Sequence, residues 1–453
     1  YCDAHGIPLV GRGAASGLCG QGLGAGIIVD FTTYMNEVVE VNLNDSWVEV
    51  QPGVVQGVLN AQLLAASKIF PPDPSTSDYC TIGGMIANNS SGAHSLKYGG
   101  TIDYVEELTV VLADGTEARL RAWAPEAIGS REWASHPAAA VLEKLARLLV
   151  DNKQAIEEKF SSFVDKNCCG YRLDKVFQPE GLNFAKMFSA SEGTLGLITS
   201  ARLRVIDKPR AEVLAMVSFE DLDKAGEALA AILTLRPSSL EFMDQRCIER
   251  VRQRRPDLAD FLPKGTVTQF LLEFDGNDLE ALKGKAELAE GLICGDLKLA
   301  TSFVKAYDQA SKNKLWAVRK ALTPIMHTLP GPRRITSFIE DFAVEPTRLP
   351  EILRKIQAIL DRRGVEAIVF GHAGQGNLHV RPLLDLRNPA DVDTMGAVSE
   401  EVHSLVLAMG GTVSAEHGDG LSRTQFVERQ YGDIYPLFVA VSYTHLRAHE
   451  TVL

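Results

Sequence analysis

Two glycine-rich segments near the start of the chain restrict what it can fold into more than any other feature. The first, IPLVGRGAASGLCGQGLGAGIIVDF, is dominated by small residues from Gly11 to Gly17, so its backbone can approach a ligand closely and turn N–H groups towards a diphosphate. It also contains Gly20-x-Gly22-x-x-Ala25, but this dinucleotide fingerprint must open a helix, whereas residues 27–30 form a predicted strand. The segment predicts a nucleotide cofactor and argues against an NAD site of the Rossmann type.

The second segment, PPDPSTSDYCTIGGMIANNSSGAHSLKYGGT (residues 71–101), places rigid prolines before the run TIGG and a stretch of small polar residues. A third segment, SEGTLGLIT, covers residues 191–199. A single glycine-rich turn is more often only a turn, but these three segments in this order closely resemble the FAD-binding domain of the vanillyl-alcohol oxidase and p-cresol methylhydroxylase type. In that family the first loop wraps the diphosphate and the second lines the flavin.

The resemblance implies FAD as the cofactor and assigns contacts to positions in all three segments. The predicted FAD-binding residues are Arg12, Gly13, Ala14, Ala15, Ser16, Gly17, Gly20, Gln21, Thr81, Gly83, Gly84, Asn88, Ser91, Ala93 and Ile198. Ala14 and Ala15 depart from the family's usual Gly followed by Thr or Gly. Some members attach FAD covalently through histidine, but the context of His94 resembles the non-covalent 2-hydroxy-acid branch better.

Composition excludes several classes of partner. The chain has 453 residues, 45% of them hydrophobic, which is enough to bury more than one core. Its formal net charge of -12 argues against a nucleic-acid partner. No apolar run approaches the roughly 20 residues that span a bilayer, which predicts a cytoplasmic protein, with a peripheral position on the inner membrane face left open. The seven scattered cysteines predict no disulfide framework or metal cage.

Hydrophobic periodicity predicts an α+β fold with two domains. Short strands alternate with glycine turns in the first half, whereas later strands such as AEVLAMVSF alternate with helices such as DLDKAGEALAAILTL. We expect an amino-terminally truncated, p-cresol methylhydroxylase-type FAD-binding domain over residues 1–208. A substrate and metal-binding cap domain is expected over 209–441, with an antiparallel sheet and helices on one face. Residues 442–453 resemble a translated sequencing adapter and are interpreted as a foreign tail.

A histidine-rich pattern in the second half indicates the chemistry. In GHAGQGNLHVRPLL, His372 and His379 flank a glycine turn, so a hairpin can bring both imidazoles to one point. The later segment SAEHGDG adds Glu416 and His417. Two histidines and a carboxylate form a common catalytic metal set that leaves coordination positions for a substrate. A lone histidine pair is more often structural, but the added Glu-His step favours a divalent metal site.

This half resembles the C-terminal FAD-linked oxidase domain of D-2-hydroxyglutarate, D-lactate and glycolate dehydrogenases, whose motif is H-x-G-x-G-x-L-H followed by G/A-E-H-G. The resemblance implies His372, His379 and Glu416 as ligands of a divalent metal, with Zn or Mn favoured, and His417 as the general base. Gln375 stands where Asp is frequent, which puts the bonding around the hairpin in doubt. The segments HVRPLLDL and FIEDFAV look most similar to large bacterial members fused to an iron-sulfur domain.

The expected chemistry is oxidation of a hydroxy acid. Chelation of a divalent ion by the substrate carboxylate and hydroxyl lowers the hydroxyl pKa. His417, with a pKa expected near neutrality, can then take the proton while the α-hydrogen leaves as hydride to the flavin N5. In LWAVRKALTPI, Arg319 and Thr323 lie one helical turn apart and match the family's substrate arginine and threonine.

Arg381 bears on the size of the substrate. It lies two strand positions after His379, so both side chains are expected on one face, towards the metal site. An arginine beside a cationic pocket needs an anion. A second substrate carboxylate would supply it, which favours a diacid. The alternative is an ion pair with a protein carboxylate such as Asp385.

The predicted activity is FAD-dependent oxidation of a D-2-hydroxy acid, with D-2-hydroxyglutarate favoured and D-lactate or glycolate as the alternative. A non-redox, FAD-dependent transferase of the alkylglycerone phosphate synthase type is an alternative of another class, and a non-catalytic FAD-binding remnant is a third. The electron acceptor is left open between a quinone, an electron-transfer flavoprotein and a fused iron-sulfur domain missing from this chain. A homo-oligomer is also left open.

Overall fold

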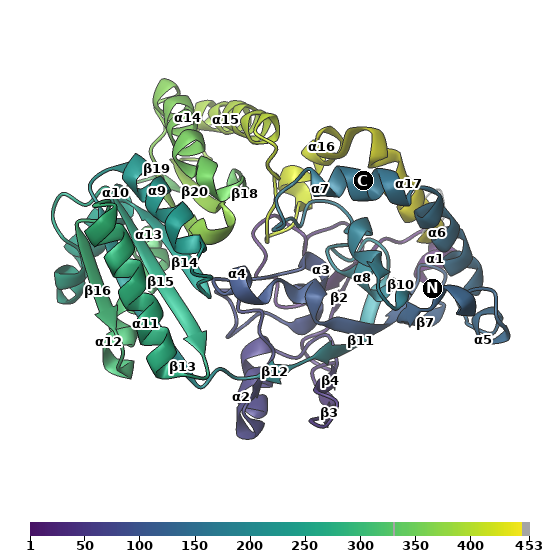
Figure 1. The fold of residues 1–453 in the computed structure, drawn as a ribbon. Helices are drawn as coiled ribbons and strands as arrows, with labels where there is room; N and C mark the ends of the chain where they lie inside the picture. Colours follow the sequence, from purple (N-terminus) through teal and green to yellow (C-terminus); the bar gives the residue numbers. More distant parts are fainter. Residues whose placement is uncertain (329–330, 446–453) are drawn as a thin grey trace.

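Two lobes lie side by side in the computed structural model, and the first and last helices described, α1 (Cys2–His5) and α17 (Tyr435–His445), lie in the same lobe (Figure 1). The structure describes residues 1–328 and 331–445, apart from the side chains of Thr323 and His327.

The first 208 residues form short strands and helices separated by loops. The strands are β1 (Leu9–Arg12), β2 (Ile27–Asp30), β3 (Val38–Asn42), β4 (Trp47–Val50), β5 (Lys68–Ile69), β6 (Val105–Val111), β7 (Glu117–Leu120), β8 (Ala122–Trp123), β9 (Phe177–Gln178), β10 (Gly181–Asn183), β11 (Leu197–Arg204) and β12 (Ile206–Asp207). The helices are α1 (Cys2–His5), α2 (Gln56–Leu63), α3 (Ile82–Asn88), α4 (Ser95–Tyr98), α5 (Arg131–Ala134), α6 (Ala139–Asp151), α7 (Lys153–Ser161) and α8 (Ala185–Phe188).

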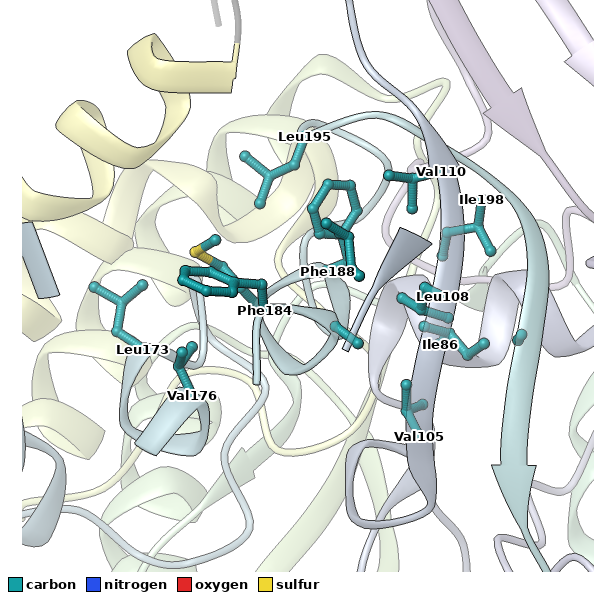
Figure 2. Packing of buried hydrophobic residues seen from close by; sticks show 14 of the residues in the cluster. Ile86, Val105, Leu108, Val110, Leu173, Val176, Phe184, Phe188, Leu195 and Ile198 are labelled. Atoms are coloured by element: carbon teal, nitrogen blue, oxygen red, sulfur yellow. The ribbon is translucent and has the colours of Figure 1, made fainter. Parts of the chain in front are cut away.

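A five-stranded antiparallel sheet in the order β3-β4-β11-β6-β7 supports this half. Leu108 and Val110 are buried because they alternate along one face of β6. They pack in one core with Ile86 of α3 and Ile198 of β11 (Figure 2). The strand predicted over residues 27–30 is confirmed as β2, which pairs in parallel with β1, so the fingerprint-like glycines do not open a helix.

The second half, from Ala211 onward, is built on longer elements. Its strands are β13 (Ala211–Phe219), β14 (Ser239–Asp244), β15 (Thr268–Gly276), β16 (Ser302–Ala306), β17 (Arg334–Ile335), β18 (Glu340–Ala343), β19 (Ala367–His372) and β20 (Asn377–Leu384). Its helices are α9 (Leu222–Leu233), α10 (Gln245–Arg254), α11 (Leu279–Glu290), α12 (Gln309–Lys320), α13 (Leu322–His327), α14 (Leu349–Arg362), α15 (Pro389–Ala408), α16 (Gly420–Tyr431) and α17 (Tyr435–His445).

The second sheet confirms the predicted α+β class and antiparallel pairing. Its order is β16-β13-β15-β14-β19-β20-β17, and β18 pairs with β20. Helices cover both faces, however, so the prediction of helices on one face is wrong. Val213 and Val217 of β13 pack with α9, α11 and α14, whereas Leu214 and Met216 pack with α10 and α12. The nearly continuous apolar run AEVLAMVSF is typical of a strand buried on both faces.

The last helices return to the first half. Phe426 of α16 and Phe438 of α17 join the core around the five-stranded sheet, and α17 lies beside α6 (Figure 1). Residues 442–445, predicted as part of a foreign tail, continue α17, and residues 446–453 of that tail lie outside the described residues. The division into domains at residue 208 stays a prediction.

Candidate active site

His372 and His379 lie on the β19–β20 hairpin, where the sequence predicted them. β19 ends at His372, and His379 pairs with Phe370 across the hairpin. The turn is tight at Gly376, which has a φ of 67° and no room for a side chain, because a Cβ would lie 1.7 Å from the carbonyl oxygen of Val344. The two buried imidazoles therefore meet edge to face, with ring centroids 5.2 Å apart.

Asp341 holds the segment that carries Glu416 and His417. Its Oδ2 accepts backbone hydrogen bonds from Ala415, Glu416 and His417 at 3.1, 3.1 and 2.8 Å. Asp341 is fully buried and has a φ of 105°, a strained conformation that these hydrogen bonds help to maintain. The sequence predicted no role for Asp341. Its signal was the pair of carboxylates, Glu340 and Asp341, inside the apolar run FIEDFAV.

Three imidazole nitrogens converge on one carboxylate oxygen. Oε1 of Glu416 lies 3.1 Å from Nε2 of His372, 3.4 Å from Nε2 of His379 and 3.5 Å from Nε2 of His417. Ligating atoms of Asp341, His379, Glu416 and His417 also lie within 4.8 Å of one another. Imidazole nitrogens and carboxylate oxygens are donors that Zn²⁺ and Mn²⁺ accept, so this histidine cluster fits a divalent metal ion.

Carboxylates behind two of the rings determine which nitrogen faces the cluster. Nδ1 of His372 lies 2.5 Å from Glu241 Oε1, and Nδ1 of His417 lies 2.7 Å from Glu340 Oε2. Each Nδ1 therefore donates a proton to its carboxylate and leaves Nε2 towards Glu416. A carboxylate behind the ring is the usual support of a metal-binding histidine.

The same surroundings separate the pKa values of the histidines. Burial lowers the pKa of His379 well below its usual value, so this ring is neutral, the form that binds a metal. Burial alone would also lower the pKa of His417, but the Glu340 and Asp341 carboxylates outweigh it and raise that pKa to about 9. The expectation of a pKa near neutrality for His417 is therefore wrong for this arrangement of charges.

Two residues from the first half reach the other oxygen of Glu416. Ser91 Oγ donates to Oε2 at 3.0 Å, and Lys166 Nζ lies 2.7 Å from the same atom. Ser91 was predicted to line the flavin, and the structure adds this contact with Glu416. Lys166 had no predicted role, since a single lysine in the segment VDKNCCG gives no sequence signal of its own.

Arg319 lies behind the cluster. Its Nε donates to Glu241 Oε2 at 3.0 Å, so it supports the carboxylate that bonds His372. Its guanidinium also stacks over Phe370, with Cζ 4.6 Å from the ring centroid. Among the described residues, neither Nη group of Arg319 has a hydrogen-bonding partner. The side chain of Thr323, the other half of the predicted clamp, lies outside the described residues.

Arg381 has a protein carboxylate beside it, as in the alternative to a second substrate carboxylate, although the partner is Glu340 and not Asp385. Its Nη2 lies 3.5 Å from Glu340 Oε2, and its Nη1 donates to Ser337 Oγ. Asp385 pairs instead with Arg387 at 2.9 Å. Glu340 comes from β18, which lies next to β20 in the sheet, a neighbour that strand periodicity alone does not reveal.

The two glycine loops lie against each other. A Cβ at Gly13 would fall 2.1 Å from Thr81 Oγ1, and one at Gly17 would fall 3.6 Å from Asn88 Nδ2. Thr81 accepts a hydrogen bond from Gly84 N at 3.4 Å and so caps α3. In the part of the chain that the structure describes, the backbone amides of residues 13–18 donate no hydrogen bond. An exposed glycine-rich run of free amides fits the diphosphate of FAD.

These loops also contact the histidine cluster. The side-chain amides of Gln21 and Asn88 donate to the carbonyl oxygen of His417 at 2.6 and 3.3 Å. Gly20 lies against Leu421, where a Cβ would be 3.1 Å from the leucine side chain. The other predicted FAD residues lie in the same three segments. Arg12 ends β1 and pairs with Asp30 at 3.3 Å, and the first loop continues with Ala14, Ala15 and Ser16. Gly83 lies in α3, Ala93 precedes α4, and Ile198 is buried in β11.

The segment around His94 joins the two halves. Nδ1 of His94 lies 2.6 Å from Asp73 Oδ2, and Nε2 lies 2.9 Å from Glu273 Oε1 in β15. Both ring nitrogens of His94 thus contact carboxylates, which supports non-covalent flavin binding. The neighbouring Ser95 Oγ donates to Gln375, and Gln375 Nε2 donates back to the Ser95 carbonyl at 3.3 Å. Gln375 therefore connects the hairpin to the first half.

Two family models match the chain. The model described as "FAD linked oxidases, C-terminal domain" matches residues 208–435. The chain belongs to the FAD-linked oxidases. A second model, "FAD binding domain", matches residues 1–121 of this FAD-linked oxidase, which include both glycine loops, and the histidine cluster lies within the first match.

Several curated proteins are similar to this FAD-linked oxidase. D-2-hydroxyglutarate dehydrogenase from Pseudomonas putida is 29% identical over 95% of this chain and 43% of its own length. Glycolate oxidase subunit GlcD from Bacillus subtilis is also 29% identical, over 94% of this chain and 78% of its own. D-lactate dehydrogenase from Anaerostipes hadrus is 27% identical, over 96% and 80%. The chain spans less than half the length of the Pseudomonas relative.

Solved structures confirm the p-cresol methylhydroxylase-type fold. Substrate-bound p-cresol methylhydroxylase has a TM-score of 0.63 at 15% identity, over 98% of this chain and 82% of that one. An alkyldihydroxyacetonephosphate synthase has a TM-score of 0.61 at 15% identity, over 97% and 72%. Since both identities are low, these likenesses bear on the fold alone.

Proposed function

We propose that this FAD-linked oxidase oxidises a D-2-hydroxy acid to the 2-oxo acid, with D-2-hydroxyglutarate as the favoured substrate. The observation that carries the proposal is the convergence of three imidazole Nε2 atoms on Glu416 Oε1. Ser91, from a loop predicted to line the flavin, contacts the same carboxylate. The residues proposed as metal ligands and base, and the loop predicted to line the flavin, are therefore adjacent, which supports oxidation of a chelating hydroxy acid.

His372, His379 and Glu416 would hold the divalent ion, Zn²⁺ or Mn²⁺. When bound, the ion supplies a Lewis acid for the substrate hydroxyl and the flavin supplies a hydride acceptor. His417 would take the hydroxyl proton at Nε2, because its Nδ1 is bonded to Glu340. Repulsion from a nearby cation lowers the pKa of an imidazole, which would bring His417 towards its neutral, basic form.

Two arginines near the cluster would support an anionic substrate. The guanidinium carbons of Arg319 and Arg381 lie 4.6 and 5.9 Å from the ring centroid of Phe370, and Phe370 packs against His379. Because Arg381 already pairs with Glu340, the preference for a diacid rests on the relatives, which include four D-2-hydroxyglutarate dehydrogenases. D-lactate or glycolate is the alternative substrate.

An anaerobic screen of D-2-hydroxy acids tests the proposal through the loss of flavin absorbance. We expect D-2-hydroxyglutarate to bleach the FAD of the metal-loaded chain faster than D-lactate or glycolate, with L-2-hydroxyglutarate as the control. Faster bleaching by a monocarboxylate would overturn the favoured substrate. No bleaching by any of these acids would overturn the dehydrogenase and favour the non-redox transferase.

The electron acceptor is proposed to be a quinone, an electron-transfer flavoprotein or an iron-sulfur domain belonging to a longer chain. Among the described helices, none has the length and apolar character needed to cross a membrane.

A further inference from the structure

The two oxygens of Glu416 have separate surroundings. Oε1 faces the three histidines of the cluster. Among the described residues, the partners of Oε2 come from the first half of the chain: Ser91 lies at 3.0 Å and Lys166 at 2.7 Å. A carboxylate that binds an ion through both oxygens would have to share Oε2 between the ion and these two contacts. The surroundings therefore favour ligation through Oε1 alone.

Lys166 is buried more deeply than a lysine usually is. Its side chain is 4% exposed, and that of Glu416 is 6% exposed. Within the described part of the chain, its Nζ finds no acceptor aligned for a hydrogen bond, although it lies in ion-pair contact with Glu416. The ammonium thus acts on Glu416 through its charge. A buried charge needs such a partner, so the pair is a built feature of the site.

The other carboxylates near the cluster have cations of their own. Arg319 pairs with Glu241, and Arg423 pairs with Glu340. Glu241 and Glu340 stand behind histidine rings and contact their Nδ1 atoms. Lys166 differs because its partner is one of the proposed ligands. Its charge therefore opposes a metal ion directly, whereas those of Arg319 and Arg423 act behind the histidines.

We propose that Lys166 is a positioning residue that restricts Glu416 to one-oxygen ligation and weakens the site's affinity for its divalent ion. The inference rests on the proposed metal site and deepens it. By occupying Oε2, Lys166 keeps a coordination position for the hydroxy acid, which must bind through two oxygens. By offsetting the charge of Glu416, it leaves the ion a stronger Lewis acid for the substrate. A lysine from the FAD-binding half would thus tune a site whose proposed ligands all come from the other half.

Mn²⁺ binding to the FAD-loaded full chain tests this inference, with free Mn²⁺ measured by electron paramagnetic resonance. In Lys166→Gln, the loss of the opposing charge should tighten Mn²⁺ binding by about 10- to 100-fold, as expected for removing one charge near an ion in a partly buried site. The KM for D-2-hydroxyglutarate should rise, because Glu416 can then take a second coordination position. Lys166→Arg should keep a Kd close to that of the unmodified chain.

Lys153→Gln, an exposed lysine on α7, is the matched control for the change in net charge and should leave Mn²⁺ binding unchanged. Where Lys166→Gln fails to retain FAD, Lys166→Met serves for the same measurement. If folded Lys166→Gln binds Mn²⁺ as tightly as the unmodified chain or more weakly, the inference about Lys166 is overturned and the proposed metal site stands. No Mn²⁺ or Zn²⁺ binding by the unmodified chain overturns the proposed metal site and the inference with it.

Discussion

Glu340 Oε2 lies 2.7 Å from Nδ1 of His417, and the buried guanidinium of Arg423 holds the other oxygen of the same carboxylate. Glu340 therefore orients the proposed base through Nδ1, while Nε2 of the same ring faces Glu416. This relationship resembles the carboxylate support of other catalytic histidines, in which the carboxylate fixes the ring and its tautomer.

Glu340→Gln should slow flavin reduction by D-2-hydroxyglutarate by about 10- to 100-fold, the usual scale for removing a partner of this kind. Since the Glu340 charge raises the pKa of His417, its loss should also lower that pKa. The acid side of the rate profile should then move to lower pH. Stopped-flow reduction across pH checks both effects, with Glu366→Gln as an exposed control. A slower rate with an unshifted profile would mean that Glu340 acts only on the fold.

Metal and base should be separable. His372→Ala should abolish Mn²⁺ or Zn²⁺ binding and activity together. His417→Ala should keep the metal and slow flavin reduction by about 10²–10⁴-fold, the scale for a lost general base. Metal analysis of the purified variants and single-turnover reduction measure the two effects. Because Nε2 of His417 also lies 3.5 Å from Glu416 Oε1, loss of metal from His417→Ala would identify it as a ligand instead.

Arg381→Ala should slow the oxidation of D-2-hydroxyglutarate and D-lactate by similar factors. Arg381 contacts Glu340, so its loss disturbs the carboxylate that orients His417 whichever acid is bound. Comparison of kcat/KM for the two acids checks this. A loss of about 2–4 kcal/mol for the diacid alone would instead show a direct, charge-assisted contact with the second substrate carboxylate.

Gly13→Ala should weaken FAD binding by about tenfold. The new Cβ would lie 2.1 Å from Thr81 Oγ1 and push the two loops apart. Overpacking of this kind costs on the order of 1 kcal/mol or more, which corresponds to about a tenfold change in Kd. Flavin content after purification and FAD titration of the stripped protein measure the effect. Gly284→Ala, where a Cβ meets no atom within 4 Å, is the matched control. The nucleotide released on denaturation should be FAD; recovery of NAD would contradict the interpretation of both loops.

His94→Gln should lower the free energy of unfolding by about 2 kcal/mol in acid, the scale of hydrogen bonds to charged groups. Burial alone would lower the pKa of His94, but Asp73 and Glu273 raise it well above its usual value. A histidine whose pKa is raised on folding stabilises the folded state fully at pH values below its unfolded pKa of about 6.5. This contribution is lost as pH rises through the pKa of the folded state. The difference between the variant and the unmodified chain should therefore shrink at high pH.

Urea unfolding at a series of pH values measures this difference, and His5→Gln on the exposed first helix is the control. A penalty that stays constant with pH would show that the charge of His94 does not contribute.

Local sequence was enough to predict the features that depend on neighbouring residues. Glycine content predicted the two loops, apolar runs predicted the strands of the second sheet, and the spacing of His372 and His379 around a glycine turn predicted the hairpin. Each of these follows from the conformations and directions that local sequence allows. The resemblance to a known family, carried by the same local motifs, supplied the cofactor and the roles.

The pairing of charged residues could not be predicted in this way, because it depends on contacts between distant parts of the chain. Ser91 and Glu416, which are hydrogen-bonded, are 325 positions apart, and Asp341 holds a turn 75 residues further along the chain. Arg381 was expected to need a substrate carboxylate because strand periodicity gives the face of a residue but not the strand beside it. Glu340, the partner of Arg381, lies on β18, and Lys166, the partner of Glu416, lies in the other half of the chain. A buried charge takes its partner from whichever element packs nearest, and that choice depends on the packing of the whole molecule.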